Sequence, residues 1–269
     1  MSRFIKHAVK TGLRSFGGYE VIQPDSYVDQ RHTNLRYLVE LMSERSIYSA
    51  REWDFLLFCA RNLDNARSQC FQDLFVLFEL EQKTNGFFVE FGAADGKTLS
   101  NSYLLEADYG WSGILSEPAR VWREQLQANR KATVDPRCVW SESGKTLDFH
   151  EHPIAVLSAL KEFRADESDV DARNGAQYQV PTVSLNDLLS QNGAPDRIDY
   201  LSIDTEGSEF AILSHFDFTR HDIKVITVEH NFVAENRQNI HDLLVGHGYI
   251  RVLERVSAWD DWFVRGETR

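Results

Sequence analysis

Acidic side chains stand at the ends of four short apolar segments of the sequence. Glu90 lies in the first segment, next to a glycine turn, and Glu117 ends the second. Asp204 and Glu206 follow the third segment, and Glu229 ends the fourth. A carboxylate beside a buried segment costs free energy unless it has a partner or a function. These acids are therefore candidate site residues that could bind hydroxyl groups or cations, or accept protons.

The first segment runs into the turn Gly92-Ala-Ala-Asp-Gly96. A dinucleotide-binding turn has the pattern G-x-G-x-x-G, which this turn lacks. A phosphate-binding loop needs a glycine where Phe91 stands, although Gly96-Lys97-Thr98 matches the end of that motif. Asp95 and Glu90 would also repel a polyphosphate. Adenosylmethionine carries a sulfonium and an ammonium group and no phosphate, so the acids at this turn suit it better.

The elements that position these residues alternate between strand and helix. This alternation predicts an α/β fold, in which a mostly parallel sheet is covered by helices on both faces. Ligands of such sheets bind beyond the carboxyl ends of the strands. Helical patterns over 33–63 and 72–82 come first. Apolar runs then predict strands over 87–91, 113–116, 137–140, 200–203, 225–228, 249–253 and 262–264, and helices over 102–107, 121–129, 185–191, 208–215 and 236–246.

Length and composition set the class of protein. The 269 residues, 42% of them hydrophobic, suit one catalytic domain with an N-terminal helical extension. We place the extension at 1–65 and the catalytic domain at 66–269. A formal net charge of −12 disfavours nucleic acid as a partner. The cysteines are odd in number and lack C-x-x-C spacing, which predicts reduced, buried thiols and a cytoplasmic location: Cys59, Cys70 and Cys138.

Two segments have unusual polarity. Residues 1–19 are basic, with apolar residues at helical spacing. They predict an amphipathic helix that makes peripheral contact with a membrane or a partner, a transit peptide, or a helix packed on its own domain. No apolar run reaches the roughly 18 residues of a membrane span. The polar stretch 157–181 fits neither helix nor strand, and we expect it to be a mobile lid over the acceptor.

From about Ser68 to Val264 the sequence resembles the FkbM family of methyltransferases. The resemblance is carried by the stretches 68–75, 88–102, 110–118, 202–209 and 229–231. It implies a Rossmann-like class I methyltransferase fold, with a seven-stranded sheet whose last hairpin is reversed. It also implies S-adenosyl-L-methionine as cofactor and O-methylation of a sugar, a glycan or a small natural product.

The resemblance further implies that the cofactor lies over the turn after the first strand, with Glu117 on its ribose hydroxyls. An acid at the end of a second strand binds ribose in the same way in other doubly wound folds. We expect cofactor contacts from Glu90, Gly92, Ala93, Asp95, Gly96, Ser100, Asn101, Glu117, Trp140, Ser141 and Asp204.

An acceptor hydroxyl needs a base or a metal ion to become a good nucleophile. His230 has the ordinary pKa best suited to a base at neutral pH, and we expect Asp204 and Glu206 beside it as catalytic residues. The alternative is Mg²⁺, for which Asp204, Glu206, Glu229 and Asn231 offer oxygen ligands and His230 a nitrogen ligand. Two further readings stay open: a module that binds adenosylmethionine without turnover, and a nicotinamide-dependent oxidoreductase.

Overall fold

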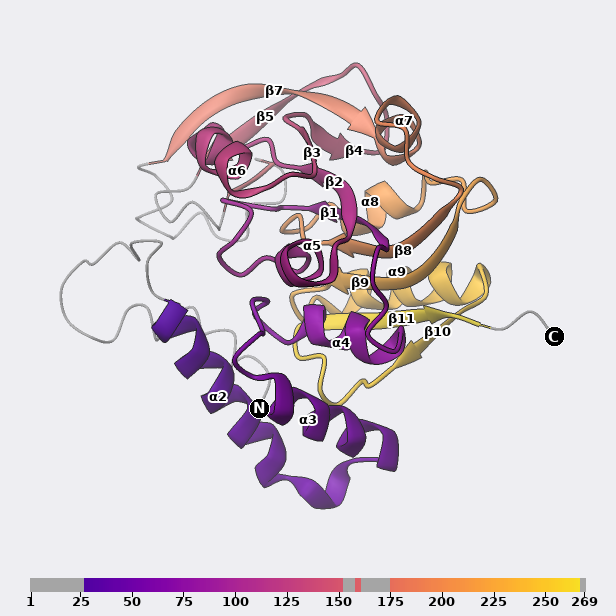
Figure 1. Cartoon of the computed structure of the whole chain (residues 1–269). Coiled ribbons are helices and arrows are strands. Elements are labelled where there is room, and N and C mark those ends of the chain that lie inside the picture. The colour runs from indigo at the N-terminus through magenta and orange to yellow at the C-terminus, as the bar shows by residue number, and fades with distance from the viewer. Residues whose placement is uncertain (1–26, 152–157, 161–174, 267–269) are drawn as a thin grey trace.

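The computed structural model describes residues 27–151, 158–160 and 175–266. Its main sheet has seven strands in the order β10-β11-β9-β8-β1-β2-β3 (Figure 1). All pairs are parallel except those of β11, which runs antiparallel to β9 and β10. The predicted Rossmann-like sheet with a reversed last hairpin is therefore confirmed. The strands are β1 (Phe87–Phe91), β2 (Ser112–Ser116), β3 (Thr133–Asp135), β8 (Arg197–Ile203), β9 (Asp222–Glu229), β10 (Tyr249–Val252) and β11 (Asp260–Arg265).

Helices cover both faces of this sheet, as predicted. On one face of the sheet, side chains of the strands form an apolar cluster with helices α2 to α6. On the opposite face they form a second apolar cluster with helices α7 to α9. They are α2 (Tyr27–Ser43), α3 (Ala50–Asn62), α4 (Gln72–Glu79), α5 (Tyr103–Tyr109), α6 (Arg123–Asn129), α7 (Leu185–Gln191), α8 (Glu209–Leu213) and α9 (Ala234–Gly246), with short 3₁₀ turns at η1 (Arg45–Ile47) and η2 (Arg120–Trp122). Among the described helices, none combines the length and the apolar content needed to cross a bilayer.

The third strand of the sheet differs from the prediction. The edge strand is β3, whereas the predicted strand at 137–140 is β4 (Cys138–Trp140) and belongs to a second sheet. Pro136 separates the two strands and has no N–H to donate to a ladder. The chain turns there, and the Asp135 carboxylate accepts the backbone N–H of Arg137 at 3.0 Å.

The second sheet has the order β4-β7-β5-β6, with β5 (Thr146–Glu151), β6 (Ala159–Leu160) and β7 (Ala176–Ser184). The expected lack of regular structure over 157–181 is therefore wrong for the residues of β6 and β7. From Ala176 to Pro181 only Val180 is buried, whereas Thr182, Val183 and Ser184 are buried in succession. The exposed first part of the strand explains why its sequence is polar. The rest of the expected lid, residues 157 and 161–174, lies outside the described residues.

The N-terminal helices pack against the C-terminal part of the chain, at the opposite end of the main sheet from β5 and β7 (Figure 1). The hydroxyl of Tyr37 on α2 donates to the carbonyl of Val256 at 2.9 Å. Arg255 pairs at 3.2 Å with Glu52, which also caps α3. The boundary near residue 65 stays a prediction, and the basic residues 1–19 lie outside the described residues. All three cysteines are free and buried, as expected.

Candidate active site

A cavity opens at the carboxyl ends of β1, β2, β8 and β9. Acids from all four ends line it: Glu90, Glu117, Asp204, Glu206 and Glu229. Among the described residues, no lysine, arginine or histidine lines this cavity. A concave site with acids of one sign and low-dielectric walls attracts cations. The acids that the sequence places at strand ends thus share one site.

The turn after β1 is shaped by two glycines with left-handed backbone. A β-carbon on Gly92 would lie 2.0 Å from the carbonyl oxygen of Asp204, so only glycine fits there. A β-carbon on Gly96 would meet Leu126 at 2.5 Å. Gly92 lines the cavity, but Gly96 does not. The first glycine therefore brings this turn against the residue that follows β8, and the second lets the turn pack on α6.

Glu90 anchors the segment that follows this turn. Its carboxylate accepts the backbone N–H of Asn101 at 2.8 Å and the hydroxyls of Ser100 and Ser102. The guanidinium of Arg130, fully buried, lies 3.6 Å away. This compensates the buried charge of Glu90. The main effect of Glu90 in the protein is to fix residues 100–102 beside the cavity.

Asn101 presents an unsatisfied oxygen. Its side-chain amide donates to Ser202 Oγ at 2.9 Å, while its Oδ1 is buried and has no hydrogen-bond partner within the part of the chain that the structure describes. Asn101 also lines the cavity. Buried polar atoms are nearly always hydrogen-bonded. A buried acceptor without a partner at the edge of a cavity therefore indicates that a bound ligand donates a hydrogen bond to it.

Glu117 is held by backbone N–H groups from both sides. Its two carboxylate oxygens accept from Ala94 at 2.9 Å and from Ala119 at 2.8 Å. Burial raises the pKa of Glu117 to about 7, against the lowering effect of these hydrogen bonds, and Glu151 adds to the rise. A carboxyl group that titrates near neutral pH therefore faces the cavity.

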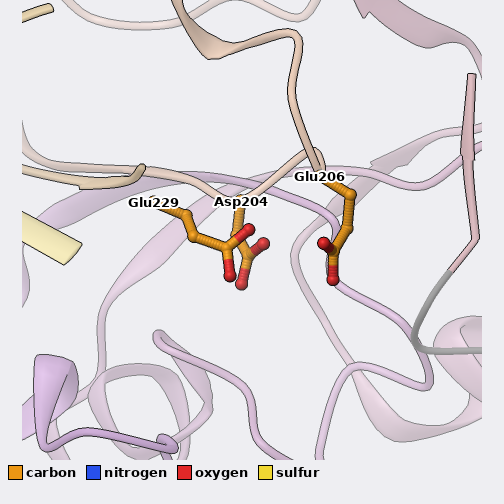
Figure 2. A group of neighbouring side chains, drawn as sticks. All are labelled: Asp204, Glu206 and Glu229. Atoms are coloured by element: carbon orange, nitrogen blue, oxygen red, sulfur yellow. The ribbon is translucent and has the colours of Figure 1, made fainter. Parts of the chain in front are cut away.

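Three carboxylates gather beyond this turn. Asp204, Glu206 and Glu229 point into the same space, and one oxygen of each lies within 4.8 Å of the others (Figure 2). The Asn231 side-chain amide donates to Glu229 and, at 3.4 Å, to Glu206. This arrangement, which we call the acid cluster (Asp204, Glu206, Glu229), can accept a proton or bind a cation.

The loop after β8 has its own support. Glu209, which is fully buried, accepts the backbone N–H groups of Thr205 at 3.1 Å and Gly207 at 2.9 Å. Burial raises the pKa of Glu209, although these hydrogen bonds act in the opposite direction. Sequence reasoning missed this residue. An acid two residues after Gly207, in the first turn of a helix, was the available signal.

Comparison with known proteins places this site in a family. The family described as "Methyltransferase FkbM domain" matches residues 90–261, from the first acid of the cavity to the start of β11. The chain belongs to the FkbM family of methyltransferases. The family implies adenosylmethionine as the methyl donor.

Two other comparisons add little. No curated protein matches the chain. Among solved structures, precorrin-6y C5,15-methyltransferase from Geobacter metallireducens GS-15 is similar over 66% of this chain and 70% of that chain. The TM-score is 0.36 and the sequence identity is 14%.

His230 occupies a different place from the expected one in this FkbM methyltransferase. It is buried, and it is not among the residues that line the cavity. Its Nδ1 accepts the backbone N–H of Phe232 at 3.0 Å, and its Nε2 lies 3.8 Å from Asp261. Successive side chains at a strand end point to opposite sides, and Glu229 is the one that faces the cavity. Of the suggested metal ligands, Asp204, Glu206 and Glu229 form the acid cluster, and His230 lies outside it.

The expected cofactor residues divide into two groups. Seven line the cavity: Glu90, Gly92, Ala93, Ser100, Asn101, Glu117 and Asp204. Four do not: Asp95, Gly96, Trp140 and Ser141. The Asp95 carboxylate instead accepts the N–H groups of Lys97 and Thr98 within the turn. Trp140 and Ser141 follow the residues of β4 that do reach the cavity, Cys138 and Val139.

Several residues that line the cavity were not predicted from the sequence. Apolar side chains from the second sheet and from η2 form one wall, and two glutamines before and at the start of α4 lie on another side. They are Trp122, Cys138, Val139, Phe149, Leu160, Gln69 and Gln72. The glutamines fall in the stretch 68–75 that carries the family resemblance, which was a signal for them. The wall residues come from a sheet that the sequence pattern did not predict.

Proposed function

We propose that the chain is an adenosylmethionine-dependent O-methyltransferase that acts on a hydroxyl group of a sugar, a glycan or a small natural product. The acid cluster beside the cofactor turn is the observation that carries this proposal, because a hydroxyl nucleophile must lose its proton. Membership of the family supports methyl transfer as the reaction. The acid cluster supports an oxygen acceptor, because its carboxylates can take up the proton of a hydroxyl group.

The residues of the cavity fit the proposed cofactor. Adenosylmethionine carries two cationic groups, and the described lining has five acids and no cationic side chain. The unsatisfied Oδ1 of Asn101 is suited to accept a hydrogen bond from an ammonium group. Glu117, held by two backbone N–H groups, is suited to accept from ribose hydroxyls. The apolar wall, with Val139, suits a purine ring.

Bound adenosylmethionine supplies a methyl group on a sulfonium, and its transfer to an oxygen releases a neutral thioether. The chain's own residues orient the acceptor and take up its proton. A carboxylate of the acid cluster accepts the hydroxyl proton as the oxygen–carbon bond forms. Glu229 is the most buried of the three acids and is fixed by Asn231, so it is our candidate base.

Mg²⁺ bound by the same acid cluster is the second candidate for activating the hydroxyl. The spacing of the acid cluster favours a metal site, because one oxygen from each of the three carboxylates lies within 4.8 Å of the others and Mg²⁺ prefers such oxygen ligands. In that case the three acids would hold the ion, which would lower the pKa of an acceptor hydroxyl.

The test is transfer of a labelled methyl group from adenosylmethionine to a panel of sugars, oligosaccharides, lipid-linked glycans and polyols. We expect a methyl ether product, and Glu229→Gln should lower turnover by about 10²–10⁴-fold, as for the loss of a general base. A chelator arm separates the two modes, because activity that vanishes with EDTA and returns with Mg²⁺ assigns the cluster to the metal. Tight cofactor binding with no transfer across the panel would indicate a binding module instead.

A further inference from the structure

The chain leaves β9 through an unusual turn. His230 follows β9, and the next two residues, Asn231 and Phe232, both have left-handed backbone, with φ of +50° and +58°. Left-handed backbone is uncommon outside glycine, and it is rarer still for a bulky residue such as phenylalanine. Two such residues in succession need strong local support.

His230 provides that support through three hydrogen bonds. Its backbone N–H donates to the carbonyl of Trp259 at 2.9 Å, and its carbonyl accepts from Val233 at 2.9 Å. Its imidazole Nδ1 accepts from the backbone N–H of Phe232 at 3.0 Å. The imidazole thus binds the second left-handed residue from inside the turn.

The other side of the imidazole faces a buried carboxylate. Nε2 lies 3.8 Å from a carboxylate oxygen of Asp261, which is buried. Arg237 binds the same carboxylate with two hydrogen bonds, at 2.9 Å and 2.7 Å, and Arg251 contacts it at 3.3 Å. Because Nδ1 accepts a hydrogen bond, the ring proton lies on Nε2, which faces Asp261.

The turn determines where Asn231 points. Its side-chain amide donates to Glu229, at the end of β9, and to Glu206, in the loop after β8. Asn231 therefore joins two acids that come from neighbouring strand ends. The distance to Glu206 is 3.4 Å, so a small shift of the turn would break that contact.

We propose that His230 is a positioning residue: its imidazole holds the left-handed turn at 231–232, and the turn sets Asn231 as a bridge between Glu229 and Glu206. His230 acts from outside the cavity and exchanges no proton with the acceptor. The inference rests on the proposed function, because the bridge matters for turnover only if the acid cluster works on the acceptor.

Two substitutions separate positioning from base catalysis. In His230→Asn the amide oxygen takes the place of Nδ1 and can still accept from Phe232. In His230→Gln the amide lies nearer the place of Nε2, and the Phe232 N–H loses its acceptor. We expect His230→Asn to stay within a few-fold of the native turnover and His230→Gln to fall by about 10²-fold, as for a misplacement of roughly 1 Å. A general base would lose activity in both variants.

A second readout needs no acceptor. Hydrogen exchange at the Phe232 amide should be slow in the native chain and in His230→Asn, and fast in His230→Gln. The Asn231 side-chain amide signals in ¹⁵N spectra should shift only in His230→Gln, and adenosylmethionine affinity by calorimetry should be equal in all three. Fast exchange at Phe232 in the native chain would overturn the proposal even if neither variant folds.

The failures of the two proposals are distinguishable. If His230→Gln keeps a protected Phe232 amide and unshifted Asn231 signals, the positioning role is wrong, whatever the acceptor panel gives. If those signals respond as expected but the native chain methylates no hydroxyl in the panel, the turn is as inferred and the proposed function is wrong.

Discussion

The α-carbon of Gly92 faces the carbonyl oxygen of Asp204 so closely that a β-carbon on Gly92 would lie 2.0 Å from that oxygen. Gly92 belongs to the turn after β1, and Asp204 follows β8. The turn that we assign to the cofactor and the first acid of the acid cluster are therefore in direct backbone contact. A change in one must move the other.

Replacing Gly92 by alanine should damage both parts of the site. The methyl group collides with backbone, and φ of +73° is strained for any side chain. We expect a large loss of thermal stability and no measurable adenosylmethionine binding by calorimetry. Gly193→Ala is the control, since φ there is +66° with no atom within 4 Å, so it costs only the roughly 1–2 kcal/mol of a left-handed residue. Equal melting temperatures for Gly92→Ala and Gly193→Ala would contradict the close contact between Gly92 and Asp204.

Adenosylmethionine affinity should depend on pH through Glu117. Burial raises the pKa of Glu117 from 4.5 to about 7. The ionised carboxylate accepts hydrogen bonds from ribose hydroxyls more strongly, so affinity should rise with pH through about 7 and then level off. Calorimetry over this range should show the rise in the native chain and not in Glu117→Gln. The same rise in both would assign the titration to another group.

The raised pKa of Glu117 also makes the stability of the folded chain depend on pH, but stability should fall as pH rises, whereas affinity should increase. The folded chain holds the Glu117 proton up to about pH 7, whereas the unfolded chain releases it near pH 4.5. The contribution of this group to the free energy of unfolding therefore falls as pH rises between these values. Glu117→Gln should remove that part of the profile in denaturant unfolding measured without cofactor. An unchanged slope would show that Glu117 titrates normally.

Glu209 should act through its hydrogen bonds and not through its charge. In Glu209→Gln the amide oxygen can still accept from Thr205 and Gly207, so turnover and stability should stay close to native. Glu209→Ala leaves these N–H groups without an acceptor and should cost about 1–3 kcal/mol of stability. Glu235→Ala, at an exposed position in the first turn of α9, is the matched control and should be nearly neutral. Equal unfolding free energies for the two alanine variants would contradict the role.

Asn101 should contribute to cofactor affinity through its unsatisfied Oδ1. A hydrogen bond to a charged donor contributes about 1.5–3 kcal/mol, so Asn101→Ala should weaken adenosylmethionine by roughly tenfold or more in calorimetry. Ser202→Ala is the control, because it removes the acceptor of the Asn101 amide and keeps Oδ1 in place. If the serine variant weakens binding as much as the asparagine variant, the oxygen has no direct role.

The main sheet could be predicted because its central strands are buried on both faces. Segments such as Phe87–Phe91 are mostly apolar runs between helical patterns, which is typical of a parallel sheet. The second sheet could not be predicted in this way. Its strand Ala176–Ser184 is mostly exposed up to Pro181 and pairs with Thr146–Glu151, a segment about thirty residues earlier. Nothing in the local pattern identifies that partner.

The meeting of the acids was predictable because parallel strands end at one edge of a sheet. The direction of His230 was not. Glu229 and His230 are consecutive, so only one of them can face the cavity, and the register of the strand decides which. The left-handed backbone of Phe232, on which the placement of Asn231 depends, is likewise invisible in residue type. Propensity disfavours that conformation, and tertiary contacts impose it.

The hydrogen bond from Tyr37 to Val256 spans 219 residues of sequence. At about 5–20 residues per second, a ribosome needs roughly 10–45 s to make the second residue after the first. The N-terminal helices are thus translated long before the surface that receives them exists. Until then the Tyr37 hydroxyl lacks its acceptor and the Phe55 ring lacks its neighbour Trp262, so the contact between the two ends of the chain is completed last.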